Sequence, residues 1–412
     1  MKNILKKFLS IIIILIIFPF VFSKNTYASS IETLAYVTAI GFDISENNIM
    51  TLTFQFAKLI STDQSGSSQP QNSETISIDC TSFDSGLALV DSYIGKKINL
   101  SHCEIIAFSE AYAANGISKE INILASNIEI RPNCNILITK SLAQDFLKNS
   151  KPTLTNLTAK YYEVLLNSNE YTGFLAKAPL WKFYISLKSH SSEAIAVLAG
   201  LNGSFVNNSS VSIEGSLMDA DTSYTAGEIP LNAKTISETI GIAVFSQDKL
   251  VGELNALESI CYLILTNQLD ICNISIPNPF TNNDTLNVMI KLNKHTKNHV
   301  DLVNNSPYIR TNISLNAYIT SVSSTSNYSK LENLDIIKEY IESYIQANIN
   351  SFLYKTSKEF KSDIVGFGKK IIPKYKTIDD WKALKWVVLY KNSFFNVTAD
   401  IKIKSGSLFI KN

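Results

Sequence analysis

Residues 96–140 read KKINLSHCEIIAFSEAYAANGISKEINILASNIEIRPNCNILITK, and short apolar runs alternate with helical stretches along them. Glu104–Phe108 is a short, mostly apolar run, which is typical of a buried strand. Ser109 follows at a position where it can cap a helix. That helix is predicted to end at Asn115-Gly116, because glycine is favoured just beyond a helix C-terminus.

The same stretch continues with a second helix and a second strand. A helix over Ser118–Ser126 would place Ile121 and Leu124 on one face. Arg131-Pro132 then leads into the apolar segment Asn133–Lys140, since the residue before a proline favours extended backbone. The order strand, helix, helix, strand predicts a sheet that is covered by helices.

Alternating and helical patterns predict further elements on both sides of this segment. The predicted strands are Thr51–Ile60, Thr75–Cys80, Leu286–Leu292, Arg310–Ile319 and Asn396–Lys404. The predicted helices are Phe83–Ile94 with Ser82 as its cap, Ala143–Lys148, Leu154–Leu166, Asn255–Leu265, Leu331–Phe360 and Trp381–Leu389. Hairpin turns are predicted at Glu46-Asn47-Asn48 and Gln247-Asp248-Lys249, and residues 61–73, which contain no apolar side chain, predict a surface loop.

The longest predicted helix carries a single apolar stripe. Its members recur at spacings of three and four residues: Leu334, Ile337, Ile341, Ile345, Ile349 and Phe352. We interpret the stripe as packing on the sheet of its own domain. A docking face for another subunit is the alternative.

These patterns predict a multidomain protein of mixed α+β and α/β class, with mixed sheets covered by helices in two to three domains. Residues 200–230 are rich in Gly, Asn and Ser, which favours a boundary there. The predicted division is a signal peptide at 1–28, an N-terminal α/β domain at 31–200, a middle segment at 201–283 that holds the hairpin 241–254, and a C-terminal domain at 284–412 that holds the helix 331–360.

The first residues have the pattern of an export signal. Three lysines precede the apolar run Phe8–Phe22, which is shorter than a bilayer-spanning helix. We expect cleavage after Ala28, with an uncleaved anchor as the alternative. The first 79 residues contain no cysteine, so lipidation at a new N-terminal cysteine is excluded.

Composition limits the possible partners. The 412 residues have a formal net charge of +1, and 45% of them are hydrophobic. A chain this close to neutral, with no basic stripe, gives no indication of nucleic-acid binding.

No motif indicates catalysis, a cofactor or a metal. His295 and His299 are spaced for a helical metal pair, but lysines surround them and a solvated loop or strand end is the expected setting. The chain contains no G-x-S-x-G and no phosphate-binding glycine loop. The five cysteines fit no zinc or redox template, and their disulfide state stays open: Cys80, Cys103, Cys134, Cys261 and Cys272. We therefore predict a protein that is not an enzyme and has no cofactor.

Five segments in order resemble the Ger(x)C family, the C subunits of the germinant receptors of spore-forming bacteria. They are AYVTAIGFD (35–43), KKINLSHCEIIAFSEAYAANGI (96–117), NIEIRPNCNILITKSLA (127–143), GIAVFSQDKLVGEL (241–254) and SDIVGFGKKIIPKY (362–375) with Trp381-Lys382 after it. The matches span almost the whole chain beyond the leader.

The resemblance implies a three-domain α+β or α/β protein without enzymatic activity. It also implies a place on the outer face of the spore inner membrane, with two integral-membrane subunits and the membrane surface as partners. The family is usually lipid-anchored, and this chain lacks the cysteine for that. Candidate partner or motif positions on the matched segments are Asn99, Ser101, His102, Arg131, Asp248, Lys249, Gly252 and Gly366.

The leading hypothesis is an exported receptor subunit that is needed for nutrient-triggered germination. An exported solute-binding protein, which captures a small ligand in an interdomain cleft, is the alternative. An exported hydrolase is a third hypothesis, because catalytic side chains can meet in space without a sequence motif.

Overall fold

The computed structural model describes residues 33–45, 49–58, 73–151, 158–203, 220–231, 233, 236–280, 284–322 and 331–404. Several sequence-based predictions lie outside these residues: the signal peptide at 1–28, the turn at Glu46-Asn47-Asn48, and the loop 61–73 apart from Ser73. Parts of three others also lie outside them: residues 59–60 of the predicted strand 51–60, residues 154–157 of the predicted helix 154–166, and residues 204–219 of the predicted boundary 200–230. Within the described ranges, no helix is both long and apolar enough to cross a membrane.

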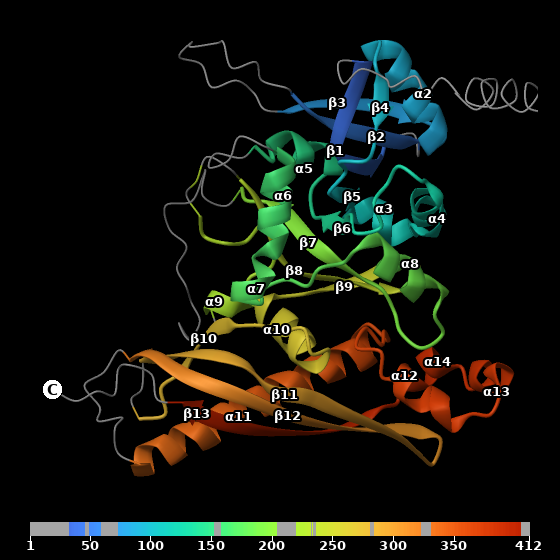
Figure 1. The fold of residues 1–412 in the computed structure, drawn as a ribbon. Helices are drawn as coiled ribbons and strands as arrows, with labels where there is room; N and C mark the ends of the chain where they lie inside the picture. Colours follow the sequence, from blue (N-terminus) through green and yellow to red (C-terminus); the bar gives the residue numbers. More distant parts are fainter. Residues whose placement is uncertain are drawn as a thin grey trace, which may run out of the picture.

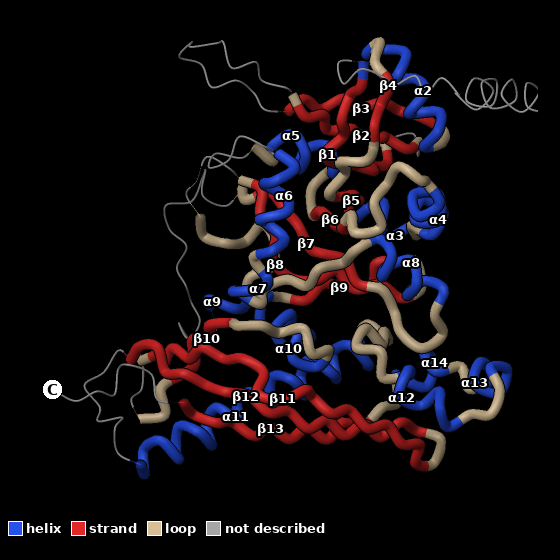
Figure 2. The backbone as a smooth tube through the Cα atoms, viewed as in Figure 1, coloured by secondary structure: helices blue, strands red, loops and turns tan. Residues whose placement is uncertain are grey.

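The chain forms two domains, each built on a mixed sheet (Figures 1 and 2). In the described residues the first sheet has nine strands in the order β3-β2-β1-β5-β6-β7-β8-β9, with β4 beside β1. The central strands β1, β5, β6 and β7 run parallel, and antiparallel pairs flank them on both sides. The strands are β1 Leu34–Ile44, β2 Met50–Ala57, β3 Ser73–Cys80, β4 Lys97–Asn99, β5 Ile105–Ser109, β6 Asn135–Thr139, β7 Ile195–Leu201, β8 Ser237–Ser246 and β9 Lys249–Leu254.

Helices cover both faces of the first sheet, as the strand and helix order predicted. One face packs against α2 Phe83–Ile94, α3 Glu110–Asn115, α4 Ser118–Ser126 and α8 Leu180–Lys188, and the other against α5 Ala143–Asn149 and α6 Thr158–Asn167. In β5, Ile106 and Phe108 belong to the first core, whereas Ile105 and Ala107 belong to the second. A parallel strand that is buried on both faces needs an uninterrupted apolar run, which is the signal that predicted β5.

Capping explains where α2 begins. The Ser82 hydroxyl accepts a hydrogen bond from the Ser85 amide at 3.2 Å, and the Ser85 hydroxyl accepts one from the Ser82 amide at 3.2 Å. The predicted cap is therefore confirmed, and α4 occupies the predicted range. Ser109 lies at the N-terminus of α3, but its hydroxyl accepts no capping bond, so that predicted role is wrong.

The second sheet has the order β10-β11-β12-β13. Its strands are β10 Cys272–Pro277, β11 Thr285–Val303, β12 Ser306–Val322 and β13 Phe394–Lys404. Helix α11 Leu331–Tyr354 packs on this sheet and passes into a π-helical turn at Lys355–Glu359. Ile337, Ile341 and Ile345 of the predicted stripe are buried in the same core as the strands, which confirms that the stripe packs within its own domain.

The hairpin 241–254 adds β8 and β9 to the first sheet, while β10 belongs to the second. Both come from the predicted middle segment, and the limits of that segment stay a prediction. Between the domains lie α7 Asn169–Thr172, α9 Ala220–Ser223 and α10 Ala256–Leu265 (Figure 1).

The predicted single helix Trp381–Leu389 is wrong. The structure has two short helices, α13 Ile378–Ala383 and α14 Trp386–Tyr390, preceded by α12 Gly368–Ile371 and a 3-10 turn at Ile372–Lys374. Lys385, with φ 50°, separates them. Trp381 and Trp386 are both buried. At about 100° per residue, five positions would place them roughly 140° apart on one helix, so a break is needed to turn both inward.

Phe360, just after the π-helical turn, packs onto β9 at Gly252. A Cβ atom at this glycine would overlap Phe360 Cε1, far inside van der Waals contact. The close approach therefore requires a residue without a side chain at this position.

We expect Gly252→Ala to lower the free energy of unfolding by about 1–3 kcal/mol, because the methyl group forces the ring or the strand to move. A double-mutant cycle tests the contact: urea denaturation is measured for Gly252→Ala, for Phe360→Leu and for the double variant. We expect a coupling energy between the two substitutions of at least about 1 kcal/mol. Gly203→Ala is the matched control, since nothing lies within 4 Å of its Cβ position. Additive effects of the two substitutions would contradict this contact.

Candidate functional site

The two domains are joined by a buried segment that we call the junction, residues 360–368. The Ser362 hydroxyl donates to the Phe245 carbonyl at 2.6 Å, at the end of β8. The Glu193 amide donates to the Asp363 carbonyl at 2.9 Å. A buried side-chain hydroxyl and a buried carbonyl of the junction therefore hydrogen-bond to main-chain groups of the first domain.

The Asp363 side chain organises the junction from within. Its carboxylate accepts hydrogen bonds from the amides of Gly366, Phe367 and Gly368 at 2.8, 3.1 and 2.9 Å, and from Trp386 Nε1 at 2.7 Å. Burial raises the pKa of this carboxyl, and the four hydrogen bonds act in the opposite direction. The arrangement has the character of a structural centre, because every donor belongs to the protein itself.

Two glycines make this turn possible. Gly366 has φ +80°, a conformation that other residues rarely adopt. A Cβ atom on Gly368 would lie 2.6 Å from the Ser191 carbonyl oxygen of the first domain. The Gly-Phe-Gly pattern at 366–368 is thus required by the turn and by the close approach of the two domains.

Glu193 is the buried acid on the first-domain side of the junction. The residue is 7% exposed, and its Oε2 accepts a hydrogen bond from the Gln247 amide at 2.7 Å. Burial raises the pKa of Glu193 to about 7, and the nearby Asp363 carboxylate adds to the rise. This carboxyl group consequently changes its charge near neutral pH.

A cavity of about 490 Å³ opens beside the junction. Its walls combine two acids, several bases and two indole rings, and they include His190, Glu193, Asp248, Trp381, Lys382, Lys385 and Trp386. Such a wall can hold a small polar molecule through charge and stacking contacts. No group of three His, Cys, Asp or Glu side chains that could hold a metal occurs in the described part of the chain.

Four of the predicted positions lie at or near the junction. The Asp248 carbonyl accepts from the Ile117 amide at 3.0 Å, and its carboxylate lies against Gly116, where a Cβ atom would be 2.8 Å away. Lys249 is exposed at the start of β9. Gly252 receives Phe360, and Gly366 forms the turn around Asp363.

The other four predicted positions lie on the segments that enter β5 and β6. Asn99 Oδ1 accepts from the Ser101 amide at 3.0 Å and from its hydroxyl at 2.5 Å, so this pair satisfies local polar groups. His102 is exposed, and its ring centroid lies 5.0 Å from that of Tyr36. Arg131 is 55% exposed and 3.9 Å from the Glu104 carboxylate, which makes a weak ion pair. The eight positions thus do not converge on one site.

The five cysteines and the histidines His295 and His299 belong to no group of three possible metal ligands in the described residues. All five cysteines are free and buried, and burial raises the pKa of the Cys134, Cys261 and Cys272 thiols. Cys103 Sγ and Cys134 Sγ lie 3.6 Å apart. His295 and His299 are exposed on β11. The predicted solvated setting is therefore confirmed, and the two residues lie on a strand and not in a loop.

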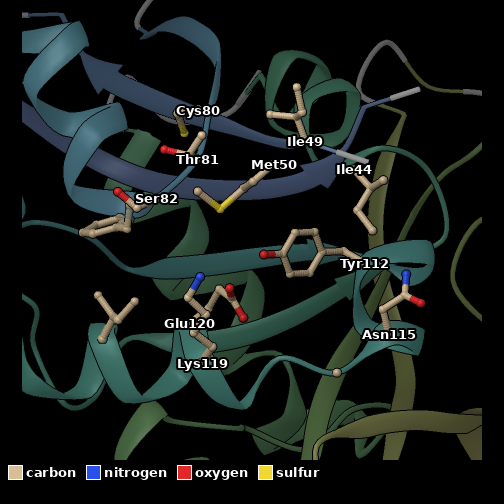
Figure 3. A pocket seen from close by; sticks show the side chains of 13 residues that line it. Ile44, Ile49, Met50, Cys80, Thr81, Ser82, Tyr112, Asn115, Lys119 and Glu120 are labelled. Atoms are coloured by element: carbon tan, nitrogen blue, oxygen red, sulfur yellow. The ribbon is translucent and has the colours of Figure 1, made fainter. Parts of the chain in front are cut away.

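A second cavity of about 420 Å³ lies within the first domain, between α2 and the α3–α4 pair (Figure 3). Tyr112 of α3 and Glu120 of α4 project into it (Figure 3). Sequence reasoning placed both helices but missed these two residues. The sequence shows only that a tyrosine and a glutamate lie on two consecutive helices with a glycine turn between them. It does not reveal that α2 packs opposite these helices and completes the cavity.

Comparison with known proteins gives two family matches, one in each half of the chain. Residues 28–200 match the family described as spore germination protein N-terminal domain, and residues 240–406 match the family described as spore germination B3/GerAC like, C-terminal. The spore germination protein GerQC of Bacillus cereus is 20% identical over 313 residues, which are 76% of each chain. The crystal structure of the GerBC protein matches with a TM-score of 0.51 at 14% identity, covering 88% of this chain and 96% of that one, which shows a shared fold.

Glu193 makes stability depend on pH. Between its ordinary pKa of 4.5 and its folded pKa of about 7, the folded chain holds a proton that the unfolded chain has released. The free energy of unfolding should therefore fall as pH rises through this window, by up to about 3 kcal/mol. Urea denaturation at about pH 5 and about pH 7.5 should show a smaller fall in Glu193→Gln. Glu339→Gln, on the exposed face of α11, is the control, and an unchanged fall in Glu193→Gln would contradict the assignment.

Proposed function

Because this chain belongs to the GerAC-like family of spore germination proteins, we propose that it is the non-catalytic, extracytoplasmic subunit of a spore germinant receptor. It acts in nutrient-triggered germination together with integral-membrane subunits. The observation that carries the proposal is the pair of family matches, N-terminal and then C-terminal, along one chain whose fold matches that of GerBC.

The structure supports a role that works through contact. The junction fixes the two domains with buried hydrogen bonds, so a partner that binds one domain meets a surface held in a set orientation to the other. Arg131 and Lys249 are exposed, and each lies on a matched segment. Exposed charged side chains on a rigid body are suitable points for recognition by other subunits.

The predicted leader supports a location outside the cytoplasm, on the membrane that holds the proposed partners. Docking onto integral-membrane subunits or an uncleaved Phe8–Phe22 segment would hold the chain there. Mass spectrometry of the mature N-terminus distinguishes these two modes.

Deletion of the gene tests the proposed function. In a strain where this chain is the sole remaining family member, we expect spores to form in normal yield and to lose nutrient-triggered germination. Loss of optical density after nutrient addition is the measurement, and the wild-type gene supplied in trans is the control. Mutant spores that germinate like the parent on every nutrient would contradict the proposal.

The cavity beside the junction favours a second candidate function, the solute-binding protein. Calorimetric titration of the isolated chain with amino acids and sugars separates the two. Binding that Trp381→Ala abolishes, together with normal germination of the deletion strain, would favour solute capture over a receptor role.

A further inference from the structure

Two of the five cysteines are in contact with each other. Cys103 Sγ and Cys134 Sγ lie 3.6 Å apart. Both residues are only 1% exposed, and both belong to the core that packs against α2, α3, α4 and α8. The other three cysteines are buried as well, but in the described residues no sulfur–sulfur hydrogen bond joins two of them: Cys80, Cys261 and Cys272.

The main chain places the two residues beside each other. Strands β5 and β6 are parallel neighbours, and their register sets Ile105 opposite Asn135. Cys134 therefore lies opposite Glu104, one position beyond Cys103 along the strand direction. The Asn135 amide donates to the Glu104 carbonyl at 2.9 Å, so a ladder bond fixes this register next to both cysteines.

This placement is compatible with a disulfide. Neighbouring strands lie about 4.8 Å apart and one residue advances about 3.3 Å along a strand, so a Cα separation of about 6 Å is expected. A disulfide joins Cα atoms that are about 4.4–6.8 Å apart and sulfur atoms that are about 2.05 Å apart. The sulfur atoms need to approach by about 1.5 Å, which rotation of the two side chains can supply.

The folded chain protects the two thiols. Cys103 Sγ donates to the Ile105 carbonyl at 3.3 Å. Burial raises the pKa of the Cys134 thiol, and the contact with Cys103 adds to the rise. Because the thiolate is the reactive form, we expect slow oxidation while the sheet is closed, and faster oxidation when this end of it opens or before the chain has folded.

A link here would join two segments that both resemble the Ger(x)C family. Cys103 lies in residues 96–117, and Cys134 lies in residues 127–143. The link would close a loop that contains β5, α3 and α4, which restricts the unfolded chain more than the folded one. The exposed candidate positions His102 and Arg131, close to these cysteines in the sequence, would then lie on cross-linked segments.

We propose that Cys103 and Cys134 form a disulfide when the chain meets a thiol–disulfide oxidant. One cysteine thiolate attacks the oxidant's disulfide, which gives a mixed disulfide and releases one thiol. The second thiolate attacks the cysteine sulfur of the mixed disulfide and releases the second thiol. The chain thus loses two protons and two electrons, and the two released thiols carry them.

The proposal does not depend on the germination role, since the purified full chain suffices to test it. An extracytoplasmic location would supply oxidants of this class, because disulfides form and persist in such compartments.

Oxidation with a glutathione buffer rich in oxidised glutathione tests the pair. One sample is refolded from urea in this buffer, and a second is incubated in it without prior unfolding. In the refolded sample we expect a mass lower by two hydrogens, and peptide mapping should find Cys103 linked to Cys134. Thiol titration after denaturation should detect the remaining cysteines, Cys80, Cys261 and Cys272. Five free thiols in both samples, or a link between other cysteines, would overturn the proposal.

Three variants locate the link. Cys103→Ala and Cys134→Ala each remove one partner, so every remaining cysteine should stay titratable after oxidation. Each variant serves as the second test if the other fails to fold. Cys80→Ala is the matched control, because it removes a buried cysteine that makes no contact with the pair, and it should still lose two thiols. Loss of two thiols in both Cys103→Ala and Cys134→Ala would sink the assignment.

Discussion

The arrangement of the two domains depends on the buried Asp363 carboxylate. This carboxylate accepts hydrogen bonds from the amides of residues 366–368 and from the Trp386 indole. The main-chain carbonyl of Asp363 accepts a hydrogen bond from the Glu193 amide of the first domain. An acid so fully buried is tolerated only because each of its bonds is charge-assisted. Removing the side chain would leave three buried main-chain amides without acceptors.

The hairpin turn at 247–248 also brings together segments that lie far apart in the sequence. Asp248 lines the cavity beside the junction, and its carbonyl bonds to Ile117, the residue just before α4. The first turn of α4 carries Glu120, whose carboxylate faces the other cavity. The hairpin turn at 247–248 therefore bonds to the residue before the helix that lines one cavity, and it lines the other cavity itself.

Much of the local structure could be predicted because short-range physics sets it. Periodicity and hydrogen bonds between near neighbours explain four features that were predicted: the range of α4, the Ser82 cap, the apolar run of β5 and the apolar stripe on α11. The helix predicted over 381–389 failed for the opposite reason, because the need to bury Trp381 and Trp386 together overrides the helical pattern. Among the candidate positions, Asn99 and Ser101 also satisfy each other locally.

The sequence by itself determined the family resemblance, the class of fold and most helix and strand positions, since these depend on the order and spacing of side chains. Only the tertiary structure decided which polar side chains line a cavity together or are buried together. Glu120 and Tyr112 face one cavity, and Glu193 and Asp363 are buried at one junction, although 170 positions separate the latter pair. Sheet order and domain packing bring such residues together, and no local pattern encodes contacts over that separation.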